Sequence, residues 1–240
     1  GIFMLFGQRE LAEVAFFTGI TPTATAAPVI VGLLGERIDF AVSAFLATNF
    51  GMACLFPFLI PVAIGDPAPT VFFDVIKSLL IVVGIPLLLA IPVRKFYKNY
   101  RELPKKLKNV SFFAWVIAIF LIIANASQFL RGQQGSIDTH LLWKIALLSA
   151  AICFVNFYFG RFIGGRRYRR EASQVLGQKN TTLTIFLALT YANPLVALGP
   201  TFYVIWHNAW NACQLQMRAV REKRKRLRAE LLLRPHGGRH

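Results

Sequence analysis

Seven apolar stretches dominate this sequence, and most of them reach the roughly 20 residues that an α-helix needs to cross a lipid bilayer. The stretches are residues 11–34, 39–64, 71–93, 110–130, 141–160, 173–191 and 194–214. Hydrophobic residues make up 55% of the 240-residue chain and charged residues only 16%, which is too few to cover a soluble domain of this size. We therefore predict an all-α, polytopic transmembrane helical bundle without a soluble domain.

The basic residues gather in three segments outside these stretches. Residues 94–108, 161–170 and 218–240 carry seven, five and nine of the 27 Lys and Arg residues. Seven alternating spans place all three segments on one side of the membrane, which the positive-inside rule makes the cytoplasmic side. We predict a multi-pass protein of the cell inner (cytoplasmic) membrane, with residues 1–217 as the transmembrane domain and residues 218–240 as a basic cytoplasmic tail.

Charge, cysteine and motif patterns exclude several functional classes. The basic residues that give the net charge of +16 cluster outside the apolar stretches, so the expected partner is the lipid bilayer and not nucleic acid. All three cysteines fall inside apolar stretches, which leaves no disulfide or zinc framework. The chain has no G-x-S-x-G, H-E-x-x-H or P-loop motif, so we do not expect an enzyme. The sequence does not indicate an oligomeric state.

Two of the apolar stretches are interrupted by polar residues at membrane depth. In residues 21–28, "TPTATAAP", Pro22 and Pro28 each remove a backbone donor and disfavour helix in the preceding residue. Residues 177–182, "GQKNTT", interrupt the sixth stretch. The interrupted stretches are five helices apart, which is the spacing expected of two inverted five-helix repeats. Such discontinuous helices point to the binding site of a transporter.

The polar side chains of the two breaks form the predicted substrate- and ion-binding site, because half-helix ends at the midplane can hold ions or charged groups. The predicted residues are Thr21, Thr23, Thr25, Gln178, Lys179, Asn180, Thr181 and Thr182. An ionisable residue at this depth is functional by default, so Lys179 is the main candidate. The alternative is that Lys179 extends from a helix end toward the membrane interface.

The interrupted segments resemble two helices of the bile acid:sodium symporter family. "RELAEVAFFTGITPTATAAPVIVGLL" is similar to the family's fourth helix, whose break reads approximately P-G-G-T-x-S-N. "VLGQKNTTLTIFLAL" is similar to its ninth helix, with the break E-x-G-x-Q-N, and "LVALGPTFYVIWHNAWN" to its last. The resemblance covers nearly the whole chain. It implies a divergent bacterial-type member that comprises helices four to ten of a ten-helix fold and lacks the first three.

The resemblance also implies that the two broken helices cross within the fold. The function that it implies is secondary transport of a small organic anion by alternating access, with sodium bound near the crossing. Residues that match the family's two motifs are Pro22, Thr25, Gly177 and Asn180. However, Ala27, Pro28 and Val175 stand where the family has its serine, asparagine and acidic sodium ligands. We therefore expect degraded sodium sites and no metal site.

Lys179 stands at the family's glutamine position and could replace the ion. Desolvation disfavours the charged form of a buried amine, so loss and gain of a proton could take the place of sodium release and binding. Alternatively, a permanently charged Lys179 could neutralise an anionic substrate. Sodium and the proton are both possible coupling ions, and no other cofactor is expected.

Two further hypotheses remain open. On the same fold, the chain could be a non-transporting membrane sensor or scaffold that acts through its basic tail. That tail could lie as a helix on anionic headgroups, although we favour a plain stop-transfer anchor. His207, in "VIWHNAWNA", could titrate, but beside two tryptophans an interfacial or helix-packing role is favoured. Asn208 can hydrogen-bond between helices.

Overall fold

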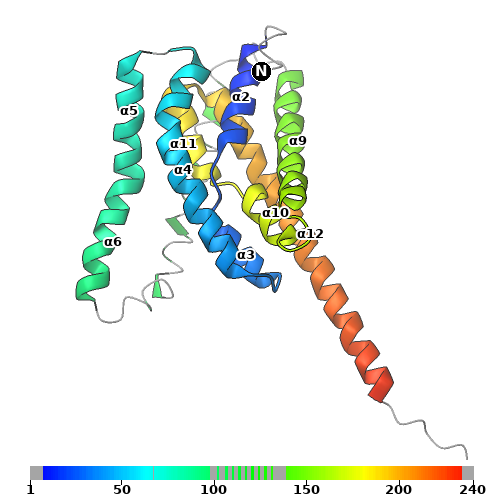
Figure 1. The fold of residues 1–240 in the computed structure, drawn as a ribbon. Helices are drawn as coiled ribbons and strands as arrows, with labels where there is room; N and C mark the ends of the chain where they lie inside the picture. The colour runs from blue at the N-terminus through cyan, green and yellow to red at the C-terminus, as the bar shows by residue number, and fades with distance from the viewer. Residues whose placement is uncertain are drawn as a thin grey trace, which may run out of the picture.

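The computed structural model describes residues 8–66, 68–97 and 139–233, with isolated positions between 102 and 131. These continuous ranges are mainly helical (Figure 1). The elements are α2 (Arg9–Ile20), α3 (Ala26–Leu33), α4 (Ile38–Ile64), α5 (Pro69–Leu79), the π-helical turn η1 (Leu80–Gly84), α6 (Ile85–Phe96), α9 (Thr139–Ile163), α10 (Arg169–Gly177), α11 (Thr181–Tyr191) and α12 (Pro194–Leu233). Most of the expected span 110–130 lies outside the described residues.

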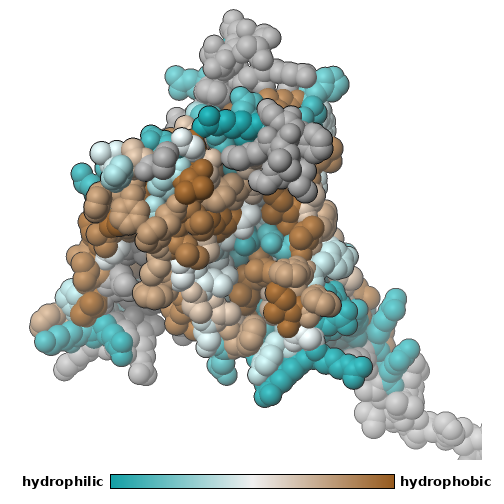
Figure 2. All heavy atoms as spheres, turned by 45° about the horizontal axis from the view of Figure 1, so that its top comes forward, coloured by the Kyte–Doolittle hydropathy of each residue, from teal (hydrophilic) through white to brown (hydrophobic). Residues whose placement is uncertain are grey.

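Helices α4 and α9 are long and apolar enough to cross a membrane. They are not core helices of a soluble protein, because only 22% and 28% of their most apolar segments are buried. Large apolar side chains face outward instead, including Phe50 and Phe58 of α4 and Trp143 and Val155 of α9. Figure 2 shows such brown, apolar surface over much of the body. Exposed apolar surface of this extent marks a contact surface, here with lipid, and supports the predicted membrane bundle.

The third expected span, 71–93, is one continuous rod made of α5, η1 and α6. Its π-helical turn lies directly before Pro86, which has no N–H to donate to the preceding turn. The Ile85 N–H bonds to the Leu80 carbonyl, five residues back, so the hydrogen-bond ladder widens just ahead of the proline. The sequence predicted the span but not this π-helical turn.

Helices α2, α11 and α12 share the largest apolar cluster. Val14 of α2, Leu187 of α11 and Val196 of α12 are fully buried in it. Behind this cluster, α9 approaches α10 so closely at Gly160 that a Cβ there would lie 2.4 Å from the Ala172 carbonyl oxygen. Helices α2 and α11, which flank the two breaks, both pack against α12.

The described parts of the basic segments share one end of the molecule. The end of α6, the α9–α10 turn and the extension of α12 lie toward the bottom of Figure 1, whereas the start of α2 and the α4–α5 turn lie at the top. Helix α12 continues beyond the expected span 194–214, through the expected domain boundary at 217, to Leu233. The described part of the basic tail, up to Leu233, is therefore helical.

Candidate functional site at the helix crossing

Both breaks predicted from the sequence are present, one between α2 and α3 and the other between α10 and α11. The two interrupted segments meet in an isolated antiparallel β-bridge between Thr23 and Lys179. The Ala24 N–H donates to the Gln178 carbonyl oxygen at 2.9 Å, and the Asn180 N–H donates to the Pro22 carbonyl oxygen at 2.8 Å. Each break thus satisfies backbone groups that the other leaves without a helical partner, as non-helical backbone at membrane depth requires.

Two threonine hydroxyls of the first break are engaged within the crossing. Thr21 Oγ1 lies 2.9 Å from the Phe17 carbonyl oxygen and accepts a hydrogen bond from Thr184 Oγ1, also at 2.9 Å. Thr23 Oγ1 donates to the Val175 carbonyl oxygen at 2.8 Å. Both predicted site residues are buried and neither lines the pocket described below. In this structure they join the broken helices to one another.

A pocket of about 250 Å³ lies at the crossing. Its walls include six of the eight predicted site residues, namely Thr25, Gln178, Lys179, Asn180, Thr181 and Thr182. Helix α12 contributes His207, Asn208 and Asn211. The structure therefore brings both breaks and a third helix together around one small cavity that polar and apolar residues line.

The Lys179 side chain is buried inside the crossing. It is 7% exposed, and its Nζ lies 3.3 Å from the Gly19 carbonyl oxygen. Gly19 belongs to the last turn of α2, where the carbonyl groups have no partner within the helix. The negative end of the helix dipole at that point favours a cation. The Lys179 ammonium therefore points across the crossing toward α2. This direction does not match the alternative interpretation, in which the side chain extends toward the membrane interface.

Two residues of α12 add unpaired polar atoms to the pocket. His207 and Asn211 are 7% and 5% exposed, and His207 Nδ1 and Asn211 Oδ1 have no hydrogen-bond partner in the described part of the chain. The sequence favours an interfacial or helix-packing role for His207, and Asn211 is not among the predicted site residues. Their i, i+4 spacing, which places both on one face of α12, is the signal that could have found them.

The positions of the resembled family's sodium ligands carry side chains without oxygen. Val175 packs in an apolar cluster with Val31 and Ala41, and Ala27 is fully buried. The part of the chain that the structure describes holds no group of three or more His, Cys, Asp or Glu residues that could bind a metal ion. Neither Asp nor Glu is among the described residues that line the pocket at the crossing, so a sodium ion there would depend on backbone, amide and hydroxyl oxygens.

Comparison with known proteins supports the resemblance seen in the sequence. The model of the sodium bile acid symporter family matches residues 2–133, which is more than half of the 240-residue chain. The match includes the first break and ends before α10 and α11. A search among curated proteins found no match. The chain belongs to the sodium bile acid symporter family, a family of helical membrane transporters, and is a polytopic α-helical membrane protein.

Proposed function

We propose that this protein is a secondary transporter that moves a small organic anion across the cytoplasmic membrane by alternating access. The observation that carries the proposal is the buried ammonium of Lys179 at the crossing, where this residue lines a pocket together with other polar residues. Its partner is the Gly19 carbonyl oxygen, and no carboxylate of the described residues forms an ion pair with it. A buried charge is costly unless it is paired. An anionic substrate would supply the missing counter-charge.

The size and lining of the pocket favour a small anion. Its volume of about 250 Å³ lies below the roughly 300–1,000 Å³ of sites for drug-sized ligands, so it suits a few-carbon carboxylate better than a whole bile acid. The side-chain amides of Asn180 and Asn211 carry N–H donors that can bind carboxylate oxygens. The single ammonium group, the neutral hydrogen-bond donors and the small volume of the pocket together favour a small organic anion as the substrate.

The same arrangement suggests how transport is coupled. The sodium-ligand positions lack oxygen-bearing side chains, whereas the Lys179 ammonium places a positive charge at the crossing. We infer that this charge, fixed or exchanging a proton, takes the role that sodium has in the resembled family. The breaks lie five expected helices apart, so the two halves would act as inverted repeats around the site. The basic end of the molecule would face the cytoplasm.

Uptake by the full chain reconstituted in liposomes tests this proposal, with labelled monocarboxylates from acetate to benzoate as substrates. We expect uptake by the wild-type protein and by Lys144→Met, which removes an exposed lysine of α9. Lys179→Met should lose most of this uptake, because the substrate's counter-charge is removed. Undiminished uptake by Lys179→Met would contradict the proposed role of the lysine. Absence of uptake for every anion would favour the sensor or scaffold hypothesis.

A further inference from the structure

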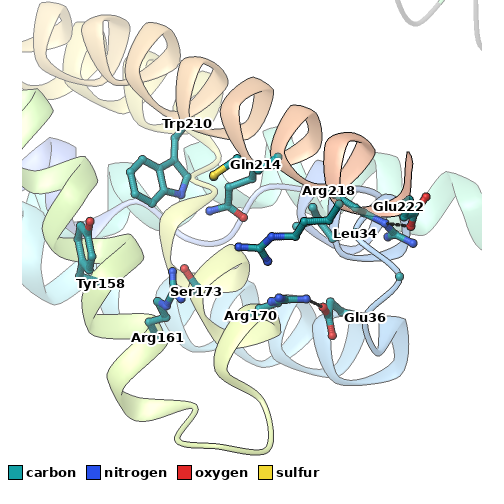
Figure 3. A pocket seen from close by; sticks show the side chains of 13 residues that line it. Leu34, Glu36, Tyr158, Arg161, Arg170, Ser173, Trp210, Gln214, Arg218 and Glu222 are labelled. Carbon is teal, nitrogen blue, oxygen red and sulfur yellow. Dashed lines mark hydrogen bonds and ion pairs between the residues drawn. The ribbon is translucent and has the colours of Figure 1, made fainter. Parts of the chain in front are cut away.

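A second pocket, of about 680 Å³, lies near the basic end of the molecule. Its walls come from α9, α10 and α12 and from the turn between α3 and α4 (Figure 3). It shares no lining residue with the pocket at the crossing. The proposed transport function does not use this pocket, so any ligand that it holds would be a separate one.

Positive charge predominates on its walls. The charged lining residues are Arg161, Arg170, Arg218, Arg221, Glu36 and Glu222. Glu36 Oε1 pairs with Arg170 Nη1 at 2.5 Å, and Glu222 Oε1 pairs with Arg218 Nε at 2.6 Å. The other two arginines have no carboxylate partner among the described residues. The pocket therefore holds two positive charges more than its own carboxylates balance.

The walls also carry hydrogen-bond donors that are not used. Arg161 Nε and Trp210 Nε1 are buried, and neither has a hydrogen-bond partner among the described residues. Figure 3 shows Trp210 and Gln214 of α12 on one side of the pocket, with Arg161 and Ser173 on the other. Buried donors in folded proteins are nearly always hydrogen-bonded. Two unused donors beside uncompensated positive charge therefore indicate a site for an anion that offers several acceptor oxygens.

The apolar surface next to the pocket indicates what carries that anion. Tyr158 lines the pocket, and Phe162 lies one turn further along the same face of α9, with 58% and 81% of these residues exposed. Arginine side chains match the oxygens of a phosphate group, often in a bidentate manner. We propose that this pocket binds the phosphate of an anionic phospholipid, whose acyl chains lie along the exposed apolar face of α9. Basic pockets between transmembrane helices on the cytoplasmic side are suited to such headgroups.

Lipid titrations of the purified full chain in detergent test this site. Phosphatidylglycerol, phosphatidylcholine and inorganic phosphate are added separately, and bound lipid is followed by native mass spectrometry together with the thermal midpoint. The pocket variants are Arg161→Gln and the more exposed Arg221→Gln, which should fold normally even if the first does not. The matched control is Arg94→Gln, which removes an exposed arginine at the end of α6.

We expect saturable binding of phosphatidylglycerol that raises the midpoint, because a ligand of the native state stabilises it. Arg221→Gln should weaken this binding about tenfold, the effect of losing one charge-assisted contact, and Arg94→Gln should leave it unchanged. Phosphatidylcholine should not bind in this way. Equal binding to the wild-type protein and Arg221→Gln would overturn the proposal. If inorganic phosphate binds the pocket more tightly than phosphatidylglycerol does, the pocket is a site for a soluble anion. That result would overturn the proposal that a phospholipid supplies the phosphate.

Discussion

At the scale of single residues, Lys179 is unusual because its charge is buried beside a carbonyl oxygen and no carboxylate of the described residues forms an ion pair with it. The last turn of α2 offsets part of the desolvation through the helix dipole. That contribution is worth up to about 2 kcal/mol even in favourable, partly buried geometries. The desolvation of a buried ion amounts to several kcal/mol. The uncompensated charge of Lys179 therefore lowers the stability of the folded protein. A bound anion would balance this charge and raise the stability.

Replacing Lys179 by methionine should therefore stabilise the protein in the absence of substrate. Methionine has a similar length but no charge to desolvate, and we expect the free energy of unfolding to rise by about 1 kcal/mol or more. Denaturant unfolding of the purified full chain in detergent measures this change. Lys144→Met, at an exposed position of α9, should stay within about 0.5 kcal/mol of the wild-type protein. A clear loss of stability in Lys179→Met would instead mean that the lysine serves as a structural partner.

The sequence predicted the residues that the two breaks contribute to the candidate site. It did not predict the residues that α12 contributes. Lys179 and the neighbouring amide side chain of Asn180 stand out because polar groups are rare at membrane depth. His207 and Asn211 lie in a helix that also carries tryptophans, asparagines and glutamines near its polar end. Only the folded arrangement shows that these two side chains turn toward the breaks.

At the scale of elements, the crossing is held by hydrogen bonds between segments that are distant in sequence. Side-chain bonds supplement the bridge, among them the bond from Thr23 to the carbonyl group of Val175, 152 residues away. The prolines and threonines of residues 21–28 and the polar stretch 177–182 predicted the two breaks. They could not predict their pairing, since the register depends on how α2, α11 and α12 pack. The sodium-ligand position Val175 likewise joins an apolar cluster, which only tertiary packing reveals.

Thr23→Val should weaken the crossing by about 1 kcal/mol, because the Val175 carbonyl oxygen loses a buried hydrogen bond. Thr190→Val is the matched control. The Thr190 hydroxyl also donates to a carbonyl oxygen, that of Phe186 at 2.8 Å, but within its own helix and at an exposed position. Its removal should change stability by less than about 0.5 kcal/mol. Thermal unfolding of both variants compares the two bonds, and equal effects would show that the Thr23 bond does not support the crossing.

At the scale of the whole molecule, the described basic segments gather at one end, which predicts the orientation in the membrane (Figure 1). Cysteines introduced singly at Asp66, in the α4–α5 turn, and at Arg166, in the α9–α10 turn, test this orientation in a background without native cysteines. We expect a membrane-impermeant thiol reagent to label Asp66→Cys in intact cells, and Arg166→Cys only after permeabilisation. Labelling of both positions from the same side would contradict the predicted topology.

The thermal stability of the purified full chain, measured in sodium and in potassium buffers over a range of pH, tests most directly whether Lys179 replaces the ion. An ion that binds the native state raises its stability, so a surviving sodium site would give an increase with sodium that potassium does not reproduce. We predict no sodium-specific increase, together with a pH-dependent step in the wild-type protein that Lys179→Met lacks. A sodium-specific increase, or an unchanged step in Lys179→Met, would contradict the account.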